Sequence, residues 1–142
     1  EPPFHGKFLI SRHHRRWAEV VRTRKKSCVL AYRGSGKSEF YTKGYPLWMA
    51  EKYPGTLGYF FSASQPLANE QLAKLTKEIE ENPKLKHLLP PKGNRRLWGR
   101  TGILLANGTE IRARGLGSQA RGGHPRWIVL DDALEDEAAQ SS

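Results

Sequence analysis

Hydrophobic positions along this 142-residue chain follow two kinds of spacing, one typical of amphipathic helices and one typical of buried strands. The clearest helical spacing lies between Ser64, which can cap a first turn, and Asn82-Pro83, which can end the last one. Apolar residues recur there at intervals of four, three and four, at Ala68, Leu72, Leu75 and Ile79. The sequence therefore predicts a helix with one apolar face.

Two further helices are predicted nearer the start of the chain. The first runs from a cap at Ser11 to about Arg22 and turns its arginines to solvent. Its buried stripe is expected to consist of Trp17, Val20 and Val21. The second follows Ser38. Because Pro46 removes a backbone donor inside it, we expect a kink or break near Tyr45.

The remaining pattern is that of strands joined by turns. Predicted strands cover Cys28–Ala31, Leu57–Ala63 and Trp127–Leu130. The first and last are apolar throughout, as strands buried on both faces of a parallel sheet are. A β-hairpin is predicted from Ile103–Leu105 and Thr109–Ala113, because Asn107-Gly108 supplies the φ > 0 residues of a tight turn. Residues 83–101 read as an irregular basic excursion. Together these elements predict an α/β fold.

The charge of the chain is strongly basic and unevenly distributed. The formal net charge is +10; all 24 Lys and Arg precede Trp127, and five acidic side chains follow it. Such a surface attracts a polyanion, and nucleic acid is the obvious one, although a basic domain without such a partner has the same composition. No apolar run approaches the ~20 residues of a membrane span, so we expect a soluble protein without a membrane partner. The single cysteine, Cys28, is expected to be a small buried residue.

A glycine-rich turn follows the first predicted strand. Ala31-Tyr-Arg-Gly-Ser-Gly-Lys-Ser38 matches the phosphate-binding loop G-x-x-x-x-G-K-[ST] except that alanine replaces the first glycine. Lys37 can reach the β- and γ-phosphates of ATP, and the Ser38 hydroxyl can bind Mg²⁺. A surface loop between a strand and a helix is the alternative interpretation. We expect the nucleotide to be bound by six consecutive residues: Arg33, Gly34, Ser35, Gly36, Lys37 and Ser38.

Two carboxylates follow the last predicted strand. Ligands of open α/β sheets bind at the carboxyl ends of the strands, so Asp131 and Asp132 are expected to face the phosphate loop. Asp131 is the expected partner of the Mg²⁺ held by Ser38, and Asp132 is the expected base that orients the attacking water. Glu135 is the alternative base, because aspartate is one methylene shorter than the glutamate that many ATPases use.

In these motifs and in their order, the chain resembles the ATPase domain of bacteriophage large terminases, the motors that pump DNA into procapsids. The likeness rests on residues 31–38 and on five further segments. These are Tyr45–Trp48, Phe61–Ser64, Glu78–Pro83, Gly115–Gly122 and Ile128–Asp132. The resemblance implies a RecA-like P-loop NTPase fold of the ASCE type, with a mainly parallel sheet flanked by helices and a hairpin before the acidic strand.

The resemblance also implies an activity and a setting. The activity is ATP hydrolysis with Mg²⁺ in a homo-oligomeric ring that moves double-stranded DNA without reading its sequence. The expected partners are a portal and a small terminase subunit, and the expected place is the host cytoplasm, docked on a procapsid. Arg33 would sit at the γ-phosphate or across a subunit boundary. Arg121 would reach a neighbouring subunit's ATP, unless it is a solvated loop arginine or a DNA-phosphate contact.

Residues 1–142 are expected to form one P-loop ATPase domain truncated at both ends, since the chain lacks an initial methionine and ends soon after the acidic motif. The family's coupling motif and nuclease domain would lie beyond it, so nuclease activity is not expected here. Two other functions remain open on the sequence. One is a helicase-like or DNA-repair P-loop ATPase, and the other is a non-catalytic nucleic-acid-binding module.

Overall fold

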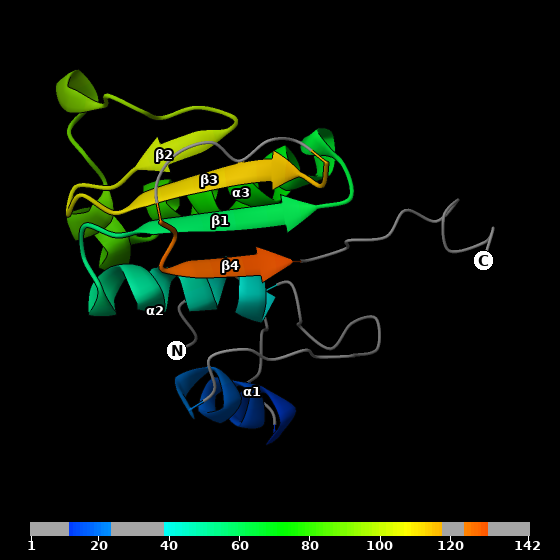
Figure 1. Ribbon diagram of the computed structural model, residues 1–142. Helices are drawn as coiled ribbons and strands as arrows, with labels where there is room; N and C mark the ends of the chain where they lie inside the picture. Colours follow the sequence, from blue (N-terminus) through cyan, green and yellow to red (C-terminus); the bar gives the residue numbers. More distant parts are fainter. Residues whose placement is uncertain (1–11, 24–38, 118–123, 131–142) are drawn as a thin grey trace.

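Four strands form one mixed sheet at the centre of the computed structural model, which describes residues 12–23, 39–117 and 124–130 (Figure 1). The strands are β1 (Leu57–Ser62), β2 (Gly102–Leu104), β3 (Glu110–Gly115) and β4 (Trp127–Leu130), in the spatial order β2-β3-β1-β4. β1 runs parallel to both β3 and β4, and β2 is antiparallel to β3. The fold is therefore α/β, and the predicted strand at Cys28–Ala31 lies outside the described residues.

The helices are α1 (Arg12–Thr23), α2 (Tyr45–Lys52) and α3 (Gln65–Glu81). Ser64 caps α3 by accepting a hydrogen bond from the backbone N–H of Leu67, and Asn82 follows its last turn, as predicted. A π-helical segment, η1 (Glu39–Gly44), leads directly into α2. Pro46 lies in the first turn of α2, where its missing N–H costs nothing, so the predicted break near Tyr45 is confirmed as a change of helix type.

The hairpin between β2 and β3 has the predicted turn. Gly108 adopts φ +89°, a conformation that glycine accepts without strain, and Asn107 accepts a hydrogen bond from the Thr109 backbone at 3.0 Å. The preceding segment differs from the irregular excursion expected there. It contains two 3₁₀ helices, η2 (Pro83–Leu88) and η3 (Lys92–Asn94), because Asn82 caps the first and Leu88 is buried in the core.

The main core lies between the sheet and the helices α2 and α3. Phe60 and Ala113 on the sheet share it with Leu72 and Ile79 of α3 and with Met49 of α2. The apolar stripe of α3 is completely buried, as its spacing predicts. Both helices thus cover the same face of the sheet, and Figure 1 shows them along one side of it.

Close packing at β4 depends on a glycine in β1. A Cβ atom at Gly58 would lie 1.9 Å from the Trp127 ring, so only glycine leaves room for this indole. Gly58 and Trp127 are register partners in the parallel ladder. The missing side chain on one strand therefore fixes the position of the large one on its neighbour.

The opposite face of the sheet is much less covered. Ile128 and Leu130 are 54% and 62% exposed, although their neighbours Trp127 and Val129 are buried. Beside them on this face lie Tyr59 and Phe61, whose rings stack with centroids 5.6 Å apart. The sequence suggested a strand buried on both faces, and in the described residues only one face of β4 is buried.

Candidate functional site

The carboxyl ends of β1, β3 and β4 lie at one edge of the sheet, because these strands are parallel (Figure 1). β4 ends at Leu130, directly before Asp131, and η1 begins at Glu39, directly after Ser38. α2 starts on the side of the sheet where the arrowheads of β1 and β4 point. The described elements thus bring the chain positions next to both predicted motifs to the same side of the sheet.

The predicted nucleotide and metal residues themselves lie outside the described residues. This holds for the phosphate loop, for the acidic residues and for the loop arginine: Arg33, Gly34, Ser35, Gly36, Lys37, Ser38, Arg121, Asp131, Asp132 and Glu135. Their roles remain predictions from the sequence.

Gln65 fixes the end of β3 at this edge. Its side-chain Nε2 donates to the Ala113 carbonyl at 2.9 Å, and its Oε1 accepts from the Gly115 N–H at 3.1 Å. The amide therefore satisfies one acceptor and one donor of β3, as a neighbouring strand would. The Leu116 N–H also donates to the Ser62 carbonyl at 2.8 Å. The chain leading to Arg121 thus leaves from a point that two strands and a helix hold in place.

An aromatic cluster anchors η1 to α1. Trp17 is 8% exposed and packs against Phe40 and Tyr41, with ring centroids 5.6 and 5.7 Å away. His14 is also buried, and its ring lies 5.2 Å from that of Trp17. The buried stripe of α1 therefore consists of His14 and Trp17, and the predicted Val20 and Val21 are only half-buried. This cluster positions the segment that directly follows Ser38.

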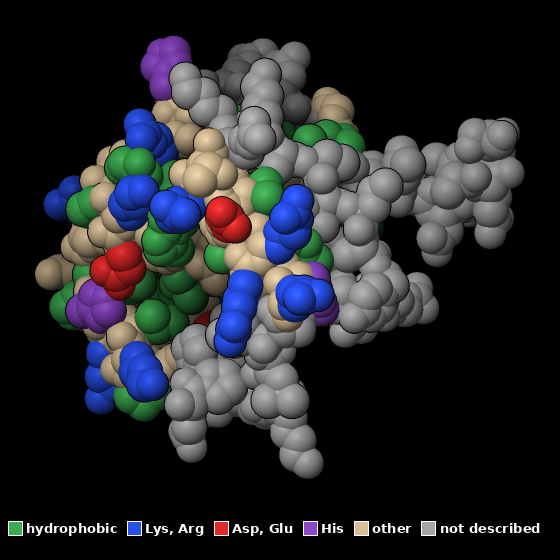
Figure 2. Space-filling view, turned by 90° about the horizontal axis from the view of Figure 1, so that it is seen from below, with side chains coloured by type: hydrophobic (Ala, Val, Ile, Leu, Met, Phe, Trp, Pro, Cys, Tyr) green, Lys and Arg blue, Asp and Glu red, His purple; other side chains and the backbone are tan. Residues whose placement is uncertain are grey.

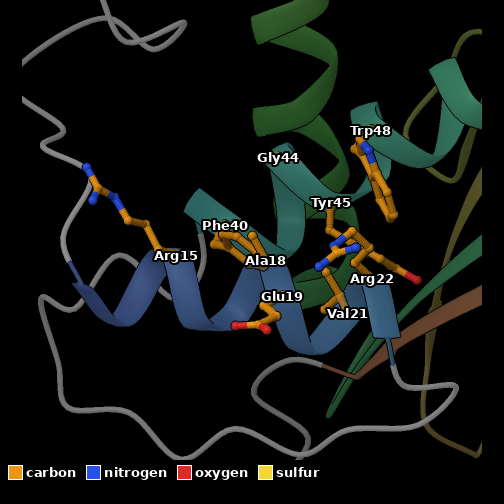
Figure 3. A pocket seen from close by; sticks show the side chains of 9 residues that line it. All are labelled: Arg15, Ala18, Glu19, Val21, Arg22, Phe40, Gly44, Tyr45 and Trp48. Carbon is orange, nitrogen blue, oxygen red and sulfur yellow. The ribbon is translucent and has the colours of Figure 1, made fainter.

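A cavity of about 540 Å³ lies between α1 and the η1–α2 segment (Figure 3). Its walls combine three aromatic side chains of one segment with charged side chains of α1 and small residues of both. The lining residues are Arg15, Ala18, Glu19, Val21, Arg22, Phe40, Gly44, Tyr45 and Trp48. Its size is that of a typical small-molecule pocket, and aromatic walls beside guanidinium groups suit a planar ring that carries an anionic group.

The aromatic walls of this cavity were not identified from the sequence. Tyr41, Tyr45 and Trp48 recur at intervals of four and three, which is a helical stripe. Trp48 counted there only as part of an apolar face, yet it is 37% exposed and lines the cavity. The spacing was a usable signal, and the facing wall from α1 was not predictable from it.

A second cluster combines cations with aromatic rings at the end of α2. The Arg126 guanidinium lies 3.9 Å from the Tyr53 ring centroid, and the Lys52 ammonium lies 4.8 Å from that of Trp48. The hydrogen bond with Arg126, followed by smaller effects that include Lys52, lowers the pKa of Tyr53 below 10.0, against an opposing effect of burial. The pKa of Tyr45 is raised above 10.0, chiefly by burial and then by Tyr53.

Neither a metal centre nor a membrane-spanning element is found in the part of the chain that the structure describes. Residues 12–23, 39–117 and 124–130 hold no group of three or more His, Cys, Asp or Glu side chains that could bind a metal ion. No helix among them is long and apolar enough to cross a membrane.

Comparisons with known proteins add no further identification. No protein-family model matches the chain, and a search of curated proteins found no match. The functional argument therefore rests on the sequence motifs and on the fold around them.

Proposed function

We propose that this chain is the ATPase domain of a viral DNA-packaging motor of the terminase large subunit type. It binds ATP and Mg²⁺ through residues 33–38, and Asp131 holds the metal with Ser38. Asp132, or Glu135 in its place, orients the attacking water. Arg33 and Arg121 neutralise charge that develops during phosphoryl transfer. In a ring of copies docked on a procapsid in the host cytoplasm, hydrolysis moves duplex DNA.

One observation carries this proposal. β4 is an apolar strand that runs parallel to its neighbour β1, and the next residue after it is Asp131. In open parallel sheets, ligands bind at the carboxyl edge. An acidic pair at this edge and a Gly-Lys-Ser loop directly before η1 are the two halves that a Mg-dependent NTPase requires. The finer fold assignment, a P-loop NTPase of RecA-like ASCE type, is part of the same proposal.

The cavity between α1 and α2 gives additional support for nucleotide binding. Tyr45 and Trp48 offer aromatic surfaces on which a base can stack, and Arg22 lies on the opposite wall (Figure 3). Stacking of a base on an aromatic side chain contributes about 1–3 kcal/mol. The side chains around η1 are thus of the types that nucleotides require.

The test is binding of a fluorescent ATP analogue with Mg²⁺ to the full chain and to two lysine variants. Lys37→Ala removes the cation that would contact the β- and γ-phosphates, so affinity is expected to fall by about tenfold or more. Lys77→Ala removes an exposed lysine of α3 and should leave affinity unchanged. Equal affinity of the Lys37→Ala and unchanged chains would overturn the phosphate-loop assignment.

Two rival functions give different results in parallel assays. A helicase-like ATPase would separate DNA strands in an ATP-dependent way, whereas a packaging motor would move along duplex DNA and leave the strands paired. A non-catalytic module would bind DNA and show no ATP binding at all. Hydrolysis assays with and without DNA on the assembled protein complete the comparison.

A further inference from the structure

The outward face of α1 is a stripe of arginines. Four arginines at positions 12, 15, 16 and 22 are all exposed, and Glu19 is the one acidic residue among them. Residues three and four apart lie on the same side of a helix, so these five side chains form one face. At a rise of about 1.5 Å per residue, the stripe from Arg12 to Arg22 is about 15 Å long.

The opposite face of α1 holds the helix in a defined orientation. His14 and Trp17 are buried against one another and against the η1 segment through Phe40 and Tyr41. Because these contacts fix the inner side, the arginines point away from the protein. Figure 2 views the molecule from the side on which α1 lies, and Lys and Arg side chains gather over this face.

The charge of the stripe is not compensated within the described residues. The ion pairs found there join Lys43 to Glu39, Lys74 to Glu70, His87 to Glu51 and Arg112 to Glu110. None involves an arginine of α1. Four guanidinium groups on one rigid helix therefore face solvent with a single carboxylate between them, in a chain of net charge +10.

We propose that this arginine face of α1 binds the phosphate backbone of duplex DNA. Each strand presents one phosphate per about 3.4 Å of helix axis, so a 15 Å stripe can face roughly four phosphates of one strand. Guanidinium groups form two parallel hydrogen bonds with phosphate oxygens, and contacts with phosphates carry no sequence information. The face thus suits a protein that must hold any DNA sequence.

The choice of duplex DNA as the polyanion rests on the proposed function, whereas binding to phosphates by α1 requires no ATP hydrolysis. The other large set of exposed cations lies in and after η2 and provides a matched control. Lys84, Lys86, Lys92 and Arg96 are exposed like the α1 arginines. This segment follows the exposed Glu80 and Glu81 and contains His87, which pairs with Glu51. Its cations therefore have carboxylates close by.

The experiment measures duplex DNA binding by the full chain at several salt concentrations without nucleotide. One variant changes the four α1 arginines to glutamine, which retains helix propensity, and the control variant changes the four cations of the η2 region to glutamine. Both lose the same charge. Each lost phosphate contact should reduce the slope of log K against log [salt] by about 0.9. The α1 variant is expected to lose about three units of slope, and the control less than one.

Several results would overturn the inference. Equal slope changes in the two variants would mean that only overall charge matters, and no change in the α1 variant would exclude this face. Binding to single-stranded but not duplex DNA would also contradict it. Circular dichroism establishes that the α1 variant remains folded. Because these assays contain no nucleotide, loss of DNA binding in the α1 variant supports the inference even if the Lys37→Ala test rejects the ATPase.

Discussion

The two faces of the sheet differ sharply in how they are packed, although the same strands form both. On the face covered by α2 and α3, Phe60, Ile111 and Val129 are buried in one apolar core. On the other face, β3 presents Arg112 and Arg114, and β4 presents exposed Ile128 and Leu130. Within the described residues, stability therefore comes chiefly from one face. The other combines charged and apolar surface that is available for contacts.

The largest expected effect compares adjacent phenylalanines of β1 that point to opposite faces. Phe60 is 2% exposed in the core, and Phe61 is half-buried against Tyr59. Phe60→Ala should lower the free energy of unfolding by about 3–5 kcal/mol, because it leaves a cavity in a closed core. Phe61→Ala should cost half as much or less, because part of its ring already contacts water. Urea denaturation of both variants measures the difference. Equal losses would show that the second face is packed as firmly as the first.

A smaller effect compares two glutamines of α3. Gln65→Leu should cost about 1–3 kcal/mol, because the Ala113 carbonyl and the Gly115 N–H lose their side-chain partner. Gln71→Leu is the matched control, since Gln71 is 7% exposed and its Oε1 has no hydrogen-bond partner. Replacing this buried oxygen by apolar atoms should be neutral or stabilising. Thermal unfolding of the two variants separates these outcomes. A neutral Gln65→Leu would mean that the end of β3 is held without this side chain.

The smallest effect concerns two tyrosines of the α2 region at alkaline pH. The pKa of Tyr45 is raised by burial, so its contribution to stability is complete below pH 10 and is lost as the pH rises further. The pKa of Tyr53 is lowered by Arg126, so its contribution is complete above pH 10 and is lost as the pH falls through the lowered value. Absorbance titration of the Tyr45→Phe and Tyr53→Phe variants should assign the later ionisation to Tyr45. The reverse order would contradict the burial of Tyr45.

The candidate site was predictable in part. The spacing of Leu72, Leu75 and Ile79 gave the longest helix correctly, and Asn107-Gly108 gave the hairpin, because both signals act between residues close in sequence. The pairing of Arg126 with Tyr53 has no such signal, because these residues meet only after β4 is placed beside β1. The burial of His14 was also missed, since helical spacing identifies a face but not the aromatic ring that covers it.

The sequence by itself determined the local elements of this protein: the ends of α3, the turn between β2 and β3, the two strands β1 and β4, and the motifs that flank them. These follow from backbone preferences and from periodicity over a few residues. Only the tertiary structure decided the order β2-β3-β1-β4, the fit of Trp127 over Gly58 and the choice of which face the helices cover. Those features depend on complementary shapes of segments that are distant in the sequence, and no local pattern encodes that fit.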